Sequence, residues 1–212
     1  MRLNMKGLID IYKIKDLHNG LGQFSQHLYL NLVEKKMKDL ELDFLVPGHP
    51  SVPLKSAPSI GYIKGNFRRR YFPGLNQTYA FWHSVQQFPS FLPNKHTPLI
   101  LTIHDLNFLV EKDKSRAIWY LKRLQKNVNR ANYITTISNF TKTEIEKHVD
   151  LKGKNIQVIH NGISPNQHIE GKKPGFISGR YFFFSIGEFK IKKNFHALIP
   201  MMKYFPDHQL VI

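Results

Sequence analysis

The stretch that decides the expected fold is YFFFSIGEFKIKKNFHAL, residues 181–198. Its first five residues are β-prone and uncharged, Gly187 closes the run, and residues 194–198 have helical spacing. Three cations lie in the turn: Lys190, Lys192 and Lys193. A strand, a glycine turn and a helix N-terminus in this order hold nucleotide phosphates in many α/β proteins. Taken alone, an ordinary strand-to-helix junction with solvated lysines explains the stretch better, so the rest of the chain has to decide.

The same alternation of strand and helix runs back through the chain. Strand-like stretches occupy residues 7–12, 42–46, 79–82, 98–103, 131–137, 156–159 and 209–212. Helical patterns occupy residues 24–37, 115–130 and about 194–203, and a further helix starts after Ser138. Such alternation predicts an α/β fold with a Rossmann-like, mainly parallel, doubly wound sheet. In the helix at 115–130, spacing predicts a buried stripe of Ile118, Leu121, Leu124 and Val128.

A change of composition divides the chain. Residues 165–179 contain two prolines, three glycines and little apolar character, which is typical of an interdomain linker. We therefore expect a complete domain over residues 1–164 and the start of a second Rossmann-like domain over residues 180–212. That second part holds a single strand, helix, strand unit, which cannot cover its own apolar faces.

Composition narrows the class of protein. With 212 residues and 42% hydrophobic content, the chain can bury a sizeable core. Its formal charge of +16 predicts an anionic partner, for which nucleic acid, anionic lipid and sugar nucleotide all qualify. The absence of cysteine excludes disulfides and thiol chemistry. There is no apolar run long enough for a transmembrane helix, and charges interrupt residues 1–15, so we expect a cytoplasmic protein.

Two places in the first domain are candidates for ligand contact. Gly20 and Gly22 flank the start of a helix, where small residues let a ligand approach backbone amides, although a capping turn explains them equally. His104 and Asp105 end the apolar strand at residues 98–103. Since open α/β sheets bind ligands outside the carboxyl ends of their strands, we expect His104 to face a ligand. A hydrogen-bonded surface turn is the simpler alternative.

The stretch KGNFRRRYF, residues 64–72, has four cations, no acid and interleaved aromatic residues. Such a stretch can lie on an anionic bilayer, pair with single-stranded nucleic acid, or form a solvated loop. For the membrane alternative, the contact would involve Phe67, Arg68, Arg69, Arg70 and Tyr71. No known nucleic-acid motif occurs, and the basic residues are spread along the chain, so nucleic acid is not the expected partner.

Four stretches taken together resemble the family 4 glycosyltransferases. They are NGLGQFSQHL, LTIHDLNFL, TTISNFTKTEIEKH running into VIHNGIS, and FFFSIGEFKIKKNFHAL. The resemblance implies the GT-B fold, in which an acceptor-side Rossmann-like domain faces a nucleotide-sugar-binding one. It implies retaining transfer of a sugar from a nucleotide-sugar co-substrate to a carbohydrate or lipid-linked acceptor, in synthesis of bacterial surface polysaccharide. Neither a cofactor nor a metal ion is implied.

The resemblance also implies roles for individual residues. Gly20 and Gly22 match the glycine turn near the donor phosphates, and His104 matches the histidine beside the transferred sugar, which we expect to be catalytic. Lys193, with Lys192 beside it, matches the lysine turn that neutralises the leaving diphosphate, and Asn194 is expected to cap the next helix. Contacts to acceptor or substrate are expected where other strands end or turn: His83, Asp105, Ser138 and Asn161.

The chain also departs from the family pattern. Glu188 stands where many relatives carry arginine, with Lys190 or Lys192 as its substitute, and the paired glutamates that hold the donor are missing. We therefore expect a fragment that is inactive alone. The alternatives are a basic nucleic-acid-binding α/β module and a non-catalytic remnant of a glycosyltransferase.

Overall fold

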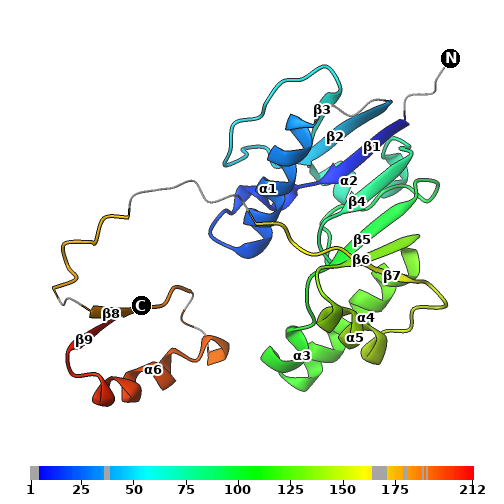
Figure 1. Cartoon of the computed structure of the whole chain (residues 1–212). Helices are drawn as coiled ribbons and strands as arrows, with labels where there is room; N and C mark the ends of the chain where they lie inside the picture. Colours follow the sequence, from blue (N-terminus) through cyan, green and yellow to red (C-terminus); the bar gives the residue numbers. More distant parts are fainter. Residues whose placement is uncertain (1–4, 36–38, 164–170, 179–180, 188, 190) are drawn as a thin grey trace. The chain divides into compact units, whose positions relative to one another are not determined.

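The computed structural model describes residues 5–35, 39–163, 171–178, 181–187, 189 and 191–212. It divides into two compact units, Met1–Gly162 and Ile163–Ile212, and each is described by itself (Figure 1). The first unit therefore ends close to the predicted boundary at residue 164. The predicted linker at 165–179 lies partly outside the described residues, as do Glu188 and Lys190.

The first unit is built on a seven-stranded sheet in which every neighbouring pair of strands is parallel. The strand order is β3-β2-β1-β4-β5-β6-β7. The strands are β1 (Met5–Asp10), β2 (Leu40–Val46), β3 (Ile60–Lys64), β4 (Phe81–Ser84), β5 (Leu99–Ile103), β6 (Tyr133–Thr136) and β7 (Ile156–Val158). The predicted doubly wound, Rossmann-like α/β fold is thus confirmed, while β3 was not predicted.

Helices connect the strands. They are α1 (Gly20–Glu34), α2 (Phe67–Tyr71), α3 (Phe108–Glu111), α4 (Lys114–Arg130) and α5 (Asn139–His148), with the 3₁₀ turns η1 (Tyr12–Lys15) and η2 (Pro73–Leu75). The short helices α2 and α3 were not predicted. In α4 the predicted stripe is wrong at Ile118, which is 45% exposed; Ala117 and Asn127 are buried together with Leu124 and Val128.

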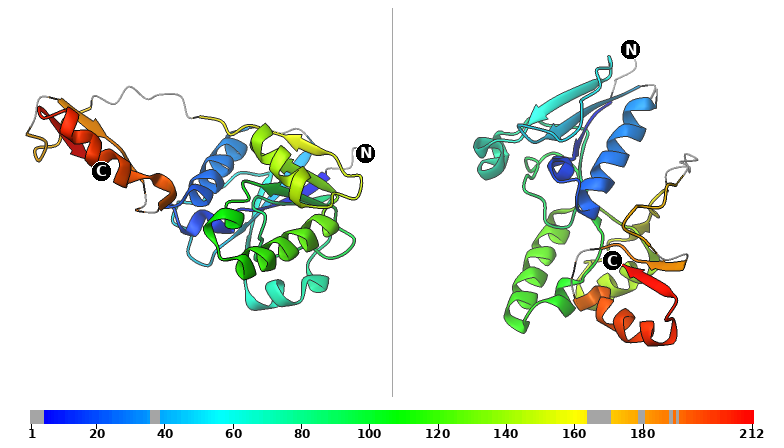
Figure 2. Two further views of the ribbon diagram at one scale, coloured as in Figure 1. Left: turned by 90° about the horizontal axis from the view of Figure 1, so that it is seen from below. Right: turned by 90° about the vertical axis from the view of Figure 1, so that its left-hand side faces the viewer.

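The core consists of two clusters on opposite faces of the sheet. Leu8 and Ile9 are consecutive residues of β1, so their side chains point to opposite faces, and each belongs to a different cluster. Tyr29 of α1 packs in the cluster of Ile9, whereas Leu124 of α4 and Ile145 of α5 pack in the cluster of Leu8. Consequently α1 covers one face, and α4 and α5 lie on the other; α1 and α4 are seen on opposite sides of the sheet in Figure 2.

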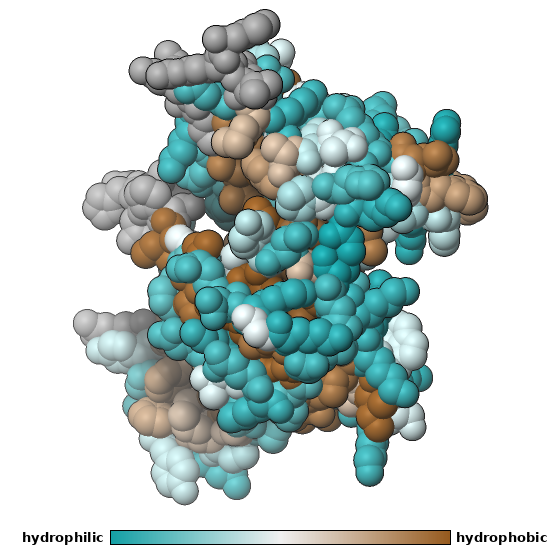
Figure 3. All heavy atoms as spheres, turned by 90° about the vertical axis from the view of Figure 1, so that its right-hand side faces the viewer, coloured by the Kyte–Doolittle hydropathy of each residue, from teal (hydrophilic) through white to brown (hydrophobic). Residues whose placement is uncertain are grey.

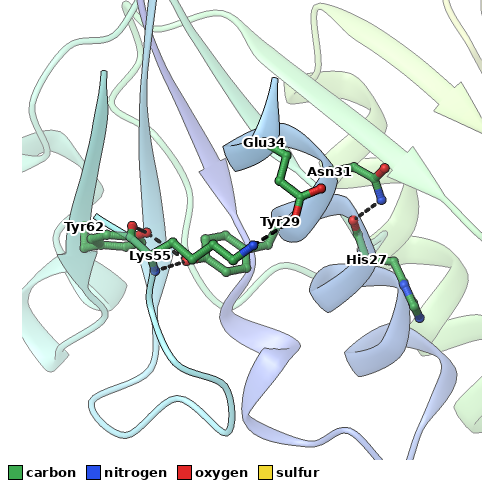
Figure 4. A network of polar contacts seen from close by, with 6 residues as sticks. All are labelled: His27, Tyr29, Asn31, Glu34, Lys55 and Tyr62. Atoms are coloured by element: carbon green, nitrogen blue, oxygen red, sulfur yellow. Dashed lines mark hydrogen bonds and ion pairs between the residues drawn. The ribbon is translucent and has the colours of Figure 1, made fainter. Parts of the chain in front are cut away.

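The proline-rich loop at residues 47–58 is held to the sheet by a closed set of hydrogen bonds (Figure 4). The Lys55 amide donates to the Tyr29 hydroxyl at 2.6 Å, the two tyrosine hydroxyls are 2.9 Å apart, and the Tyr62 hydroxyl donates to the Lys55 carbonyl. Each hydroxyl therefore donates once and accepts once. The Lys55 ammonium also pairs with Glu34 at 2.8 Å, so the loop is tied to both α1 and β3.

The second unit contains one parallel pair of strands, β8 (Tyr181–Phe184) and β9 (His208–Val211). Between them lie η3 (Ile191–Lys193), α6 (Phe195–Met201) and η4 (Met202–Tyr204). The expected strand, helix, strand order is observed. Asn194 is the N-cap residue of α6, as predicted, with a positive φ of 54°, but its side chain makes no capping hydrogen bond within the described residues. Its carbonyl accepts from the Ala197 amide instead.

The surface is mostly polar where Figure 3 shows it, and apolar side chains reach it in separate groups. Within the described ranges, no helix combines the length and the apolar character needed to cross a membrane.

Candidate functional site

The order of the strands reverses between β1 and β4, because β2 and β3 follow on one side of β1 and the later strands on the other. Ligands of open α/β sheets bind outside the carboxyl ends of the strands near such a point. Here that edge has an open hollow of about 400 Å³. Its lining consists of Lys13, Asn19, Gly20, Leu21, Phe24, His104, Asp105, Ile137 and Asn161. Four residues predicted from sequence, namely Gly20, His104, Asp105 and Asn161, thus lie around one hollow.

His104 follows β5 and is buried to 9% exposure. Its Nε2 lies 2.8 Å from the carbonyl oxygen of Val85, and its ring meets that of Phe24 edge-on at 4.8 Å. A carbonyl oxygen can only accept, so Nε2 carries the proton in this contact. In the neutral ring Nδ1 then has the free electron pair. The ring that lines the hollow therefore has a defined tautomer with one acceptor nitrogen.

The charge state of His104 follows from its surroundings. Burial lowers the pKa of His104, and the hydrogen bond to Val85 and the charge of Asp105 only partly oppose this shift. The neutral ring is therefore the form present at neutral pH. A neutral histidine can accept a hydrogen bond from a substrate hydroxyl without placing a positive charge beside it.

Gln87 holds the His104 segment in place. Its side chain accepts from the His104 amide at 3.3 Å and donates to the Asp105 carbonyl at 3.1 Å. The Gln87 carbonyl accepts in turn from Asn127 of α4 at 2.8 Å. On the other side, the Thr141 hydroxyl donates to the His104 carbonyl at 3.2 Å. Hydrogen bonds from two helices and the segment after β4 thus position the end of β5.

The two glycines of the first turn have different surroundings. Gly20 lines the hollow, and a Cβ added there would meet no atom of the described part of the chain within 4 Å. A Cβ on Gly22 would lie 1.7 Å from the carbonyl oxygen of Asp16, so the glycine permits close packing of α1 against the preceding loop. The Gly22 amide donates to the Asn19 side chain at 2.8 Å, which caps the helix. Gly20 has open space for a ligand, and Gly22 has a packing role of its own.

The other predicted residues lie elsewhere. His83 is within β4, half-buried, with Nε2 2.8 Å from the Thr102 hydroxyl, and burial lowers its pKa to about 4, with a smaller contribution from His104. Ser138 caps α5 by accepting from the Thr141 amide at 3.1 Å. Neither lines the hollow.

The lysine turn belongs to the second unit. There the exposed side chain of Lys193 lies beside Gly187: its Cε is 3.7 Å from where a glycine Cβ would be. The side chain of Lys192 lies outside the described residues. The phosphate-binding role of both lysines stays a prediction.

Five lining residues were not singled out from the sequence as site residues: Lys13, Asn19, Leu21, Phe24 and Ile137. Lys13 adds a cation to the hollow. Asp10, also overlooked, ends β1 with 1% exposure; its Oδ1 accepts from the Tyr12 amide at 3.0 Å, and its Oδ2 has no hydrogen-bond partner among the residues that the structure describes. Burial raises the pKa of Asp10 to about 7. In the sequence, Asp10 could have been identified by its place at the end of an apolar strand.

Among the residues described, no group of three metal-ligating side chains comes together. That the reaction needs no metal ion stays a prediction from the resemblance.

A parallel sheet with polar side chains gathered at its switch point defines a Rossmann-like ligand-binding domain. Residues 32–167 match the model of Glycosyltransferase Family 4, and the chain belongs to that family. A similar protein is the O-antigen chain mannosyltransferase RfbU of Salmonella typhimurium strain LT2, with 24% identity over 147 residues, which is 63% of this chain. The aligned region spans 40% of RfbU.

Proposed function

We propose that this chain is the acceptor-side part of a glycosyltransferase that moves a sugar from a nucleotide-sugar donor to a carbohydrate or lipid-linked acceptor in surface polysaccharide synthesis. The observation that carries the proposal is that His104, whose Nε2 donates to the Val85 carbonyl, lines a hollow at the switch point of a family 4 domain. Because RfbU is a mannosyltransferase, a mannose donor is the first to test.

The proposed role of His104 is to orient the transferred sugar. Its acceptor nitrogen would take a hydrogen bond from a sugar hydroxyl and stabilise positive charge that develops at the sugar ring. In the transfer, the bond between the anomeric carbon and the diphosphate oxygen breaks, and that oxygen keeps the electron pair. The acceptor oxygen bonds to the anomeric carbon on the same face, and its proton leaves with the diphosphate.

The negative charge of the leaving diphosphate requires cations or amide donors. In the hollow, Lys13 is the cation beside Gly20. Lys192 and Lys193 of the second unit are the further candidates, with no metal ion required. In this proposal Asp105 and Asn161 contact the sugar substrates from the ends of β5 and β7.

The proposal is tested with labelled GDP-mannose and UDP-hexoses, offered with bacterial lipid extract and with free oligosaccharides. The 212-residue chain and any longer protein that contains it are assayed in parallel. We expect transfer by the longer protein, with retained anomeric configuration in the product by NMR, and none by the 212-residue chain. Failure of all transfer in the longer protein would contradict the proposed activity, and an inverted product would contradict retention.

A peripheral contact with the inner face of the plasma membrane is also part of the proposal. It is supported by helix α2, where Phe67 is 71% and Tyr71 57% exposed, next to Phe72 at 53%. The same helix contains Arg68, Arg69 and Arg70. Exposed aromatic rings on both sides of three consecutive arginines suit the headgroup region of an anionic bilayer.

A further inference from the structure

A second hollow, of about 340 Å³, lies along the same edge of the sheet in the first unit. Its lining follows β1, β3 and β4 in the chain and consists of Tyr12, Gly65, Asn66, Phe67, Arg70, Tyr71 and Phe91. Consecutive residues of η1 line the two hollows: Lys13 the first and Tyr12 the second. The two hollows are therefore neighbours, and a molecule that passes over η1 would reach both.

Four of the seven residues that line the second hollow are aromatic. Tyr12 and Phe91 meet edge-on at 4.9 Å, and Phe67 and Tyr71 lie 4.5 Å apart. A Cβ on Gly65 would lie 2.6 Å from the Phe91 ring and 2.8 Å from the Tyr12 ring, so only glycine lets both rings pack on the backbone there. The rings of Phe67 and Tyr71 nevertheless stay more than half exposed. Rings held in place within a hollow whose exposed lining is mostly polar are suited to a ligand that has both an apolar face and polar groups.

Polar groups accompany the rings. The Asn66 side-chain oxygen accepts from the Arg69 amide at 2.9 Å, which leaves its NH₂ group as a donor. The Arg70 guanidinium lies 5.6 Å from the centre of the Tyr71 ring, and no ion pair of Arg70 occurs in the described part of the chain. Tyr12 and Tyr71 add two hydroxyls. Rings with donors at their margin fit a pyranose, whose C–H face packs on a ring and whose hydroxyls lie around its rim.

We propose that this aromatic hollow binds a sugar unit of the acceptor, and that the acceptor is therefore a glycan of at least two units. One unit would lie in the aromatic hollow, while the unit that receives the transferred sugar crosses η1 to His104. The inference rests on the proposed function, since it assigns the acceptor of the same reaction.

The test is a saturation-transfer NMR titration of the 212-residue chain, without lipid or donor. The probes are soluble di- to tetrasaccharides of mannose, galactose, glucose, rhamnose and N-acetylglucosamine at millimolar concentration. We expect at least one to bind, with shifted ring resonances of Phe67 and Tyr71. Phe67→Ala and Tyr71→Ala should each weaken binding about five- to tenfold, since a stacking ring is lost.

The matched controls are Phe72→Ala and Leu75→Ala. Both side chains are exposed, at 53% and 62%, in the same segment, but neither lines the hollow. We expect them to keep the affinity for saccharide, and thermal melts verify the fold of all four variants. The inference is overturned if no saccharide binds, if Tyr71→Ala binds as well as wild type, or if UMP or GMP displaces the saccharide, which would indicate a nucleobase site.

These outcomes are independent of the transfer assay. Saccharide binding that depends on Tyr71, together with no transfer by any longer form, would contradict the proposed function and leave the sugar site standing. Active transfer by a Tyr71→Ala protein with an unchanged KM for the acceptor would contradict the sugar site alone.

Discussion

The hydrogen bonds that hold His104 in place use its backbone and one ring nitrogen. Its proposed chemistry uses the other ring nitrogen. Its backbone is held by Gln87 and Thr141, and its ring by Val85. Among the contacts that the described residues make, the ring nitrogen Nδ1 is left to accept from a substrate. A residue of this kind should be replaceable without loss of the fold, since most of the hydrogen bonds that locate the segment involve its backbone.

We expect His104→Ala to lower kcat/KM for transfer by about 100-fold or more in an active form of the protein. The free energy of unfolding should fall by only about 1–2 kcal/mol, from the lost ring contacts and the unpaired Val85 carbonyl. His104→Gln is the control, because its amide can still donate to Val85 while the ring nitrogen is gone. Steady-state kinetics and urea melts check this. If activity and stability fell together in both variants, the histidine would be structural.

Asp10 makes the stability of the fold depend on pH. Its pKa is 3.8 before burial and about 7 in the fold, so between these values the folded chain binds the extra proton. Raising the pH through this window therefore lowers the free energy of unfolding. Asp10→Asn removes the effect and should stabilise the protein at pH 8 by at most about 4 kcal/mol.

The measurement is urea unfolding of wild type and Asp10→Asn at pH 8 and near pH 4. The variant's gain should be present at pH 8 and largely gone near pH 4, because this pH is close to the pKa of 3.8 that Asp10 has in the unfolded chain. An equal difference at the two pH values would show that the carboxyl does not titrate as proposed. The contribution of His83 to the pH dependence has the opposite sign. Because its pKa is lowered to about 4, the free energy of unfolding decreases as the pH falls from 6.5.

Among the elements, α2 is where charge and exposed apolar surface coincide. Replacing Arg68, Arg69 and Arg70 by glutamine should leave the helix folded, because Asn66 caps it and none of the three side chains belongs to the core. The affinity for vesicles containing phosphatidylserine, measured by sedimentation, should drop about tenfold or more, because each charge contributes about 1 kcal/mol to binding.

The matched control replaces Lys122, Arg123 and Lys126 of α4, three exposed cations outside the 64–72 stretch, by glutamine. This variant has the same net charge as the α2 variant, so it should keep its binding if α2 is the contact. Equal losses in both variants would indicate a diffuse effect of the +16 charge, and unchanged binding of the α2 variant would contradict the membrane contact.

The elements also show how far sequence reasoning reaches. Strands such as β5 are short apolar runs between turn residues, and the rule for parallel sheets places His104 and Asp105 at a ligand edge from the residue pattern. By contrast, α2 and α3 have five and four residues, too few for a helical period to be recognised. The stripe on α4 was misassigned because Ala117 and Asn127, which face the core, are not the apolar residues that a periodicity count selects.

Within the site, sequence reasoning was limited because the decisive contacts join residues from different elements of the fold. Sequence identifies Gly20 and Gly22 as a pair, but only the path of the chain at Asp16 separates an open glycine from one required by packing. Similarly, Lys13 and Phe24 reach the hollow because η1 and α1 fold over the strand ends, and no local pattern reports this.

On the scale of the whole molecule, the two units differ in how well their strands are covered. The strands of the first unit contribute buried residues to clusters on both faces, and Leu99, Leu101 and Ile103 of β5 are fully buried. In the second unit, Phe182 is 40% and Phe184 63% exposed. A two-stranded sheet is marginal in water without more strands or a covering helix.

We therefore expect amide hydrogens of β5 to exchange at least about 1,000-fold more slowly than those of β8 and β9, since local opening of a poorly covered sheet costs little. Hydrogen exchange of the 212-residue chain, followed by mass spectrometry, measures both units in one sample. The same chain should show no micromolar binding of GDP- or UDP-sugars by calorimetry, because a sheet that opens readily is a poor platform for a diphosphate. Equal protection of the two units would contradict the proposed weakness of the second. Micromolar donor binding would show that its lysine turn is already organised to hold phosphate.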